Sequence, residues 1–516
     1  MVSEVRHESY WNATAPASAY PALSGEIEVD VAIIGGGIVG VTTARMLKDR
    51  GLSVALVEAR RIGEEVTGKS TAKVTSQHNI AYTAIERNFG EDGARCYADA
   101  NEAGLRTILA LAEQYRIACE LARCPAITWT NDEKEVARIE EEVKLARLLE
   151  LPATLTRDTG LPFEVLAAMR WDDQARFHPV KYVKGLAATL PGDGGHVFER
   201  SRVIDWAPDR IVTDRGSVRA RHVVMATHLP LGQTGLFYAE NYPHMHPVLM
   251  GKAQTGRMLE SMTINVETPH FSARGHRDES GMEWMIFAGG TYKHGHVDEE
   301  RERFDALEQF ALDHFGVVPA YRWTNEDYTP MDQAPFVGWS SSGSGAYLVA
   351  TGFNAWGITN GTAAAIMIAD LVTDRENPWL DLFDARRIKP IAGGAQFVKG
   401  NAEVATHLVG GYLAAKPDNV DMLKPGEAAI LKIDGHNVAA YRDAQGRIHA
   451  VSAVCTHMGC LVGWNETDRG WDCACHGSRF ALDGEVIHGP AVKPLAPVAE
   501  KLGSGEPVGV EEVAGT

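Results

Sequence analysis

Cysteine and histidine residues crowd into two short stretches near the C-terminus of this sequence. Residues 455–460 read Cys-Thr-His-Met-Gly-Cys, and residues 473–478 read Cys-Ala-Cys-His-Gly-Ser. Two cysteine–histidine pairs on two loops suit a [2Fe–2S] cluster, in which two thiolates hold one iron and two imidazoles hold the other. Zinc is the alternative, but the spacings C-x-H-x-x-C and C-x-C-H fit no four-ligand zinc pattern as well. The sequence therefore predicts an iron–sulfur centre.

A glycine-rich turn near the N-terminus could hold a dinucleotide. An apolar strand predicted over residues 31–34 leads into a G-x-G-x-x-G formed by Gly35, Gly37 and Gly40, and Glu58 ends the next predicted strand. Gly35 permits a tight turn, Gly37 lets the backbone approach a pyrophosphate, and Gly40 lets helix and strand pack closely. The following helix N-terminus attracts phosphates, and Glu58 can accept hydrogen bonds from a ribose. The motif alone does not separate FAD from NAD, although an acid at position 58 disfavours a 2′-phosphate.

The bulk composition is that of a globular protein of two to four domains. The chain has 516 residues, of which 45% are hydrophobic and 23% charged, and its net charge is −18. That charge argues against nucleic-acid binding, which needs a basic surface. No apolar run is long enough to span a membrane, and residues 1–20 show no basic segment followed by an apolar core. We therefore expect neither a spanning helix nor a secretory signal, and a cytoplasmic location.

The predicted elements change in character along the chain. Residues 28–58 read as strand, glycine-rich turn, helix and strand, and residues 86–150 have helical spacing. A further helix is expected over residues 299–315, and residues 346–373 read as strand, turn and long helix. From about residue 420, short strands separated by Gly/Asp turns are typical of an all-β domain.

Three further segments favour FAD over NAD. Residues 67–73 read Thr-Gly-Lys-Ser-Thr-Ala-Lys, residues 224–227 read Val-Met-Ala-Thr, and a glycine-containing turn and helix start occupy residues 350–361. Together with Arg202 and Val203, they resemble motifs of the glycine oxidase, sarcosine oxidase and D-amino-acid oxidase superfamily of FAD enzymes, although residues 67–73 are a variant form. The resemblance implies that these residues line the cofactor: Thr67, Gly68, Ser70, Thr71, Lys73, Val203, Ala226, Thr227, Gly352, Phe353, Gly357, Ile358 and Thr359. No second G-x-G-x-x-G follows a strand, which disfavours a reductase with its own NAD(P)H domain.

The two cysteine–histidine stretches resemble those of Rieske proteins of the cytochrome bc1 and b6f type, over about residues 420–510. The resemblance implies that Cys455 and Cys473 bind one iron and that His457 and His476 bind the other. Rieske oxygenases lack the extra cysteines of these stretches, so that class is disfavoured.

The same resemblance assigns roles to the remaining residues of the stretches. It implies a disulfide between Cys460 and Cys475 and a hydrogen bond from Ser478 to a cluster sulfur. The family often has tyrosine at the position of Phe480, so one hydroxyl donor is missing here. We therefore expect a lower reduction potential than in the respiratory proteins.

The resemblances imply an α/β FAD-binding Rossmann-like domain with an α+β substrate domain, followed by an all-β Rieske domain. The expected bounds are 28–85, 170–235 and 325–385 for the FAD-binding domain, 86–169 and 236–324 for the substrate domain, 386–419 for a linker and 420–512 for the Rieske domain.

The function implied is that of an FAD-dependent oxidoreductase with an iron–sulfur centre. It would oxidise a small amine or amino-acid-like substrate and pass electrons singly through the cluster to a redox partner protein or quinone-like acceptor. Electron flow in the reverse direction is compatible with the same motifs. The alternative is an electron-transfer or sensor protein, or a flavin-fed reductase of a partner, without a small-molecule substrate of its own.

Few side chains are candidates for proton transfer to or from a substrate. His78 lies just past the flavin-lining segment and resembles a position near the isoalloxazine, although a structural histidine explains it equally well. Lys293 and His294 sit at a predicted strand end of the substrate domain, where an exposed turn is the alternative. The three are candidates, and the base that would act on a substrate amine is not identified by any motif.

Overall fold

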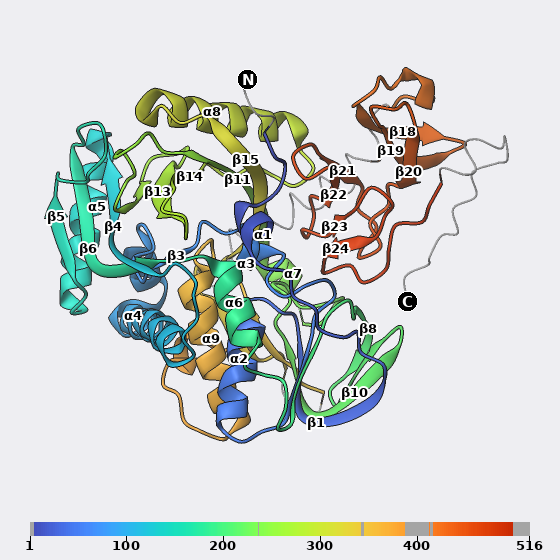
Figure 1. Cartoon of the computed structure of the whole chain (residues 1–516), viewed down its shortest axis with the longest axis horizontal. Helices are drawn as coiled ribbons and strands as arrows, with labels where there is room; N and C mark the ends of the chain where they lie inside the picture. Colours follow the sequence, from blue (N-terminus) through green and yellow to red (C-terminus); the bar gives the residue numbers. More distant parts are fainter. Residues whose placement is uncertain (1–4, 236, 342–344, 388–411, 413–415, 499–516) are drawn as a thin grey trace.

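The computed structural model describes residues 5–235, 237–341, 345–387, 412 and 416–498. Figure 1 shows a sheet with β1 and β10 at the bottom, a second sheet above it, and the strands β18–β24 on the right. Most of the expected linker, residues 386–419, lies outside the described residues. Among the described residues, no helix is long and apolar enough to cross a membrane.

The strand before the glycine-rich turn, β1 (Gly25–Ile34), lies inside an eight-stranded sheet of order β16-β17-β10-β1-β2-β7, with β8 and β9 attached through β10. β1 pairs in parallel with β10 and β2, and residues 31–34 are fully buried, as expected for a strand covered on both faces. Helix α2 packs on α9 and α6, which confirms the α/β class. The elements are α2 (Ile38–Asp49), β2 (Val54–Val57), α6 (Pro179–Ala187), β7 (Gly195–Phe198), β8 (Val203–Ala207), β9 (Arg210–Thr213), β10 (Gly216–Met225), β16 (Phe336–Trp339), β17 (Leu348–Thr351), α9 (Gly357–Val372) and α10 (Leu380–Phe383).

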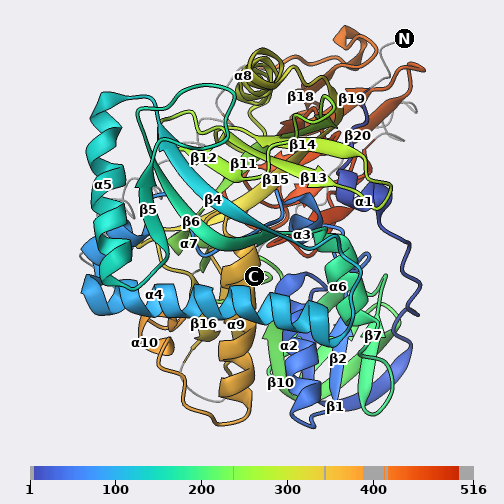
Figure 2. The same ribbon diagram turned by 60° about the vertical axis from the view of Figure 1, so that its left-hand side comes forward.

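A second sheet of nine strands has the order β15-β11-β14-β13-β12-β4-β6-β3, with β5 beside β6. Figure 2 shows the long helix α4 running below this sheet, and α4 also packs against α9. The elements are β3 (Lys73–Val74), α4 (Ala81–Gln114), β4 (Ala122–Thr130), α5 (Glu133–Leu148), β5 (Ala153–Thr156), β6 (Ala167–Arg176), β11 (Asn241–Lys252), β12 (Met262–Asn265), β13 (Ser272–Arg277), β14 (Glu283–Ala288), α8 (Val297–Phe315) and β15 (Pro319–Pro330). The helix expected over residues 299–315 is confirmed as α8.

Two expected domain boundaries fall inside strands of this second sheet. β15 continues to Pro330 because it pairs with β11 as far as Asn241, so residues 325–330 belong to the second sheet. In the same way β6 reaches Arg176 and pairs with β3 and β4. Both strands therefore place residues that were expected in the FAD-binding domain within the second sheet.

The C-terminal part is all-β, as the turn pattern predicts. It contains a three-stranded sheet, β18-β19-β20, and a four-stranded sheet, β21-β22-β23-β24, both antiparallel. Residues 455–460 follow β20, and residues 473–478 connect β22 to β23. The elements are η1 (Val420–Met422), β18 (Ala428–Ile433), β19 (His436–Arg442), β20 (Ile448–Ser452), β21 (Val462–Asn465), β22 (Gly470–Cys473), β23 (Arg479–Phe480) and β24 (Val486–His488). Within the described residues, the remaining short helices are α1 (Tyr10–Thr14), α3 (Val66–Lys69) and α7 (Phe237–Glu240).

Candidate functional site

A cavity lies at the carboxyl end of β1, where the glycine-rich turn predicts a dinucleotide. The N-termini of α2 and α9 both open into it, so two helix dipoles favour negatively charged groups there. The structure brings these predicted cofactor residues together in its wall: Gly35, Gly37, Glu58, Thr67, Ser70, Thr71, Lys73, Val203, Ala226, Thr227, Phe353, Gly357, Ile358 and Thr359.

Three predicted cofactor residues, Gly40, Gly68 and Gly352, are not among the lining residues and act through packing. A Cβ at Gly40 would overlap the carbonyl oxygen of Gly35, which is the close helix–strand approach that the motif requires. A Cβ at Gly68 would likewise overlap the carbonyl oxygen of Gly63. Gly352 has a φ of +77°, a backbone conformation that favours glycine.

Glu58 and Thr67 shape the glycine-rich turn through hydrogen bonds. The N–H groups of Gly36 and Arg60 donate to the two carboxylate oxygens of Glu58, each at 2.7 Å, and burial raises the pKa of Glu58. The N–H of Ile38 donates to Thr67 Oγ1 at 3.1 Å. The cavity thus combines a glycine cradle, two helix N-termini and an acidic residue, and these features fit FAD.

A second cavity adjoins the first on the side of the nine-stranded sheet. Ser70, Thr71, Lys73, Asn325, Ala355 and Trp356 line both. Lys73 lies at the junction, where its Nζ donates to Ser272 Oγ at 2.6 Å and to the carbonyl oxygen of Thr263 at 3.0 Å. Burial, together with the nearby charge of Arg274, lowers the pKa of Lys73 to about 7. This amine can therefore gain or lose a proton near neutral pH.

Uncharged imidazoles line the second cavity. Burial lowers the pKa of His244 to about 3 and also lowers the pKa values of His246 and His270. The Nε2 of His246 is buried and has no hydrogen-bond partner among the described residues. None of these histidines was predicted from the sequence. For His244 and His246 a signal exists, because residues two positions apart on β11 share one face of the strand.

The three predicted catalytic residues have different surroundings. His78 lines the second cavity, but its ring nitrogens are engaged by the Tyr97 hydroxyl at 2.7 Å and the Thr75 carbonyl oxygen at 2.9 Å, and burial lowers its pKa to about 3. Lys293 is exposed, and neither it nor His294 lines either cavity. We therefore assign no catalytic role to these three residues.

The predicted cluster ligands meet beside β21 and β22. Cys455 and Cys473 are buried, unbridged thiols, and the rings of His457 and His476 have centroids 5.0 Å apart. The Nδ1 atoms of both histidines are buried without a hydrogen-bond partner in the described part of the chain. Two thiols and two orphaned imidazole nitrogens form the donor set that a Rieske [2Fe–2S] cluster needs.

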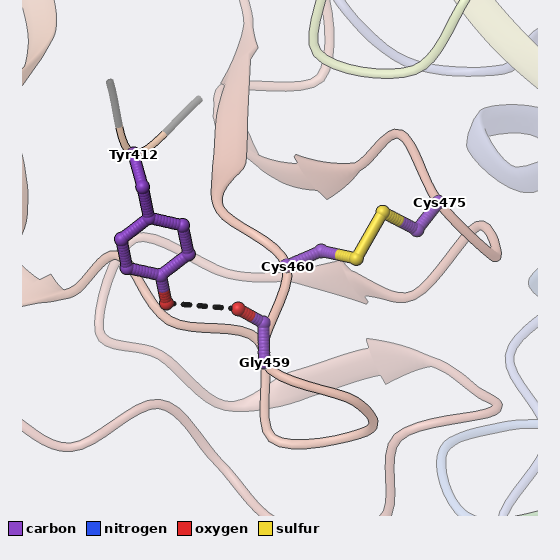
Figure 3. The surroundings of a disulfide bond; sticks show 4 residues. All are labelled: Tyr412, Gly459, Cys460 and Cys475. Atoms are coloured by element: carbon purple, nitrogen blue, oxygen red, sulfur yellow. Dashed lines mark hydrogen bonds between the residues drawn. A yellow bond between two sulfur atoms is a disulfide. The ribbon is translucent and has the colours of Figure 1, made fainter. Parts of the chain in front are cut away.

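A disulfide between Cys460 and Cys475 joins the two cluster loops (Figure 3), as the resemblance implied. The Tyr412 hydroxyl donates to the carbonyl oxygen of Gly459 at 2.9 Å, next to this bridge. The two loops are thus covalently linked, and the Cys473 sulfur lies within 4.8 Å of both sulfurs of the bridge.

The cluster loops lie directly against the FAD-binding part of the chain. His457 Nε2 is 3.2 Å from the carbonyl oxygen of Gly232. Gly232 directly follows Leu231, which lines the first cavity. The Tyr238 ring packs edge-on against both His457 and His476, with centroids 5.5 and 5.2 Å apart. The two predicted cofactor sites are therefore neighbours.

Comparison with known proteins agrees with this geometry. The family described as FAD dependent oxidoreductase matches residues 30–371, and the Rieske [2Fe-2S] domain matches residues 413–499. The chain belongs to this FAD-dependent oxidoreductase family. It is an enzyme of that class that binds FAD and a [2Fe–2S] cluster.

Its relatives differ in how much of the chain they share. The putative Rieske 2Fe-2S iron–sulfur protein YhfW of Bacillus subtilis is 35% identical over 95% of this chain and 97% of its own length. Gamma-glutamylputrescine oxidoreductase of Escherichia coli is 27% identical over 43% of this chain and 55% of its own. Glycine oxidase of Geobacillus kaustophilus superposes with a TM-score of 0.57 at 18% identity, over 70% of this chain and 100% of its own. L-proline dehydrogenase of P. horikoshii superposes with a TM-score of 0.55 at 19% identity, over 71% of this chain and 98% of its own. These two structures share the fold of the flavoprotein part.

Proposed function

We propose that this flavoprotein oxidises a small amine or amino-acid-like substrate in the second cavity and passes the electrons singly through the Rieske cluster to a redox partner or quinone-like acceptor. The observation that carries the proposal is the row of three adjoining sites: substrate cavity, flavin cavity and cluster loops. When bound, FAD takes two electrons from such a substrate and the cluster carries them away one at a time.

The lining of the second cavity supports a substrate with an anionic or hydrogen-bonding group. Lys73 and Arg138 line it together with four imidazoles, and no lining residue among those described is an aspartate or glutamate. A carboxylate would meet donors there and no negative charge. The names of the similar proteins above, which include an amino-acid dehydrogenase and an amine-type oxidoreductase, support the same substrate class.

Lys73 is the residue best situated to accept a proton from the substrate amine. It lines both cavities, so it lies between the substrate and flavin sites. Loss of hydride from an amine requires the neutral amine, and a base whose pKa is about 7 can take up the released proton near neutral pH. Trp356, whose ring centroid lies 5.9 Å from Lys73 Nζ, helps to keep the junction apolar.

Two short routes connect the flavin cavity to the cluster loops. One runs from Leu231 through Gly232 to His457. The other runs from Ala491, which also lines the cavity, through its N–H to Ser478 Oγ at 3.0 Å. Both routes support electron transfer inside one chain without a separate carrier.

The test is an anaerobic screen of amines, amino acids and hydroxy acids against the purified holoenzyme. We expect one class to bleach the flavin absorbance and then to generate the electron paramagnetic resonance signal of the reduced cluster. If dithionite reduces both centres but no candidate substrate does, the proposal fails, and a redox partner without its own substrate becomes the better description.

A further inference from the structure

The wall of the flavin cavity is built by two domains. Residues 487–492 comprise the end of β24 and the loop after it in the Rieske domain, and five of them line the cavity: Ile487, His488, Gly489, Ala491 and Val492. We name residues 487–492 the wall segment. They lie at least 260 positions beyond Ala226 and Thr227 of the FAD-binding domain, which line the same cavity.

His488 is the polar residue of the wall segment, and side chains of the flavoprotein part hold it in place. Its Nε2 lies 3.3 Å from Nδ1 of His228 and 3.4 Å from Oε2 of Glu326. His228 also lines the cavity, and Glu326 belongs to β15. His488 is 8% exposed and Glu326 1%, so these contacts are shielded from water.

Glu326 is a buried carboxylate whose two oxygens have different neighbours. Its Oε1 accepts from the Tyr328 hydroxyl at 3.1 Å and lies 2.9 Å from His294 Nε2, whereas Oε2 faces His488 and has no hydrogen-bond partner among the described residues. Withdrawal of the wall segment would take away the imidazole that faces this buried oxygen, which is unfavourable because a buried polar atom needs polar neighbours.

Backbone contacts fix the wall segment on both sides. Gly232 N–H donates to the carbonyl oxygen of Pro490 at 2.9 Å, and a Cβ at Gly489 would come within 3.2 Å of the Leu231 side chain. On the other side, Ala491 N–H donates to Ser478 in the second cluster loop. The backbone of the wall segment thus contacts both the loop that contains Gly232 and the second cluster loop.

We propose that the wall segment of the Rieske domain is a flavin-binding element, so that FAD binding and docking of the Rieske domain stabilise each other. A ligand that contacts both domains favours their docked arrangement, and by reciprocity docking tightens the binding of the ligand. The inference deepens the proposed function, because the docked arrangement is the one that keeps the cluster beside the flavin cavity.

The first test measures FAD affinity in the full chain. FAD-free protein from riboflavin-limited cultures is titrated with FAD for the wild type, for His488→Ala and for a control, His449→Ala. His449 belongs to the same domain, but it binds Asp443 at 3.1 Å and does not line the cavity. We expect the dissociation constant for FAD to rise about tenfold or more in His488→Ala, equivalent to about 1.4 kcal/mol, and to stay unchanged in the control.

The second test needs no variant. Hydrogen exchange of the wild-type chain is compared before and after FAD is added, with β19 of the Rieske domain as the internal reference. We expect FAD to slow exchange over the wall segment and to leave β19 unaffected. Visible circular dichroism of the cluster shows whether the variants of the first test have kept a folded Rieske domain.

Two results would overturn the inference: equal FAD affinity in wild type and His488→Ala, or exchange over the wall segment that FAD does not alter. An equal loss of affinity in both variants would also count against it. Neither test uses a substrate, so their outcome is distinct from that of the substrate screen.

Discussion

His457 Nε2 and the carbonyl oxygen of Gly232 lie 3.2 Å apart, and this contact joins a predicted cluster ligand to the residue that follows Leu231 of the flavin cavity. The Nε2 side of this imidazole is thus directed at the flavoprotein part. The ring of Tyr238 also packs against His457, with centroids 5.5 Å apart. Under the proposed function, this contact gives electrons a short path from the flavin to the cluster within one chain.

We predict that electron transfer from flavin to cluster is intramolecular. After rapid photoreduction of the flavin without oxygen, the cluster signal should appear with a rate constant that is the same at several protein concentrations. A rate that rises in proportion to protein concentration would contradict this. The Cys455→Ser variant, which lacks one cluster ligand, serves as the control and should keep its flavin reduced.

Phe480 should set the cluster to a lower potential than a tyrosine would. It is fully buried in β23, two residues after Ser478. A hydroxyl donor stabilises the more negative, reduced cluster, so Phe480→Tyr should raise the midpoint potential by about 20–60 mV, the equivalent of one hydrogen bond. Redox titration measures the shift, and Phe315→Tyr in α8, far along the chain, should produce none. A Phe480→Tyr variant with an unchanged potential would show that the new hydroxyl does not reach the cluster.

The parts of the site that the sequence predicted are those encoded in short stretches. Each of these motifs lies within a single short stretch: the turn from Gly35 to Gly40 and the loops at 455–460 and 473–478. Their residue types and spacing can therefore be recognised without knowledge of the fold. The disulfide between Cys460 and Cys475 followed from resemblance to a known family and is present.

The parts that the sequence did not predict depend on tertiary pairing. Glu326 and His488 are 162 positions apart, and their contact requires β15 to reach the Rieske domain, which no local pattern encodes. The boundary expected at residue 325 falls inside β15 for the same reason, because the pairing of this strand with β11 extends it to Pro330. His294, a catalytic candidate from its place at a predicted strand end, contacts Glu326.

Lys73 should give flavin reduction a dependence on pH. Its pKa is lowered to about 7, mainly by burial, so the amine is charged below that pH and neutral above it. If the neutral amine takes the substrate proton, the rate of flavin reduction should rise as the pH increases through about 7 and then level off.

The Lys73→Met variant tests this role. We expect flavin reduction to slow by about 10²–10⁴-fold and to lose the pH-dependent step near 7, while any step due to the substrate's own amine remains. Lys252→Met, at the exposed end of β11, is the control and should behave as the wild type. A Lys73→Met profile that keeps the step near pH 7 would assign it to another group.

Arg479 should be the charged residue whose loss most weakens the Rieske domain's attachment. It is 2% exposed, with Nη2 2.6 Å from Asp468 and Nε 3.1 Å from Asp472. Asp468 in turn accepts from Thr324 Oγ1 of β15 at 2.8 Å and lies 3.2 Å from Lys69 Nζ. Although burial alone raises the pKa of Asp468, Lys69 and Arg479 hold it well below its usual value.

The Arg479→Met variant removes the cation that Asp468 and Asp472 share and leaves Asp468 with Lys69 alone, which should lower the free energy of unfolding by about 3–5 kcal/mol. Its matched control is Arg447→Met, whose partner Asp443 lies 2.8 Å away at the surface, and that change should cost no more than about 1 kcal/mol. Because the folded pKa of Asp468 is lowered, its contribution is present above the ordinary aspartate pKa and is lost as the pH falls below it. Denaturant titrations at neutral and acid pH measure this loss of stability on acidification. We expect a smaller loss in Arg479→Met than in the wild type. Equal losses would mean that Arg479 does not lower the pKa of Asp468.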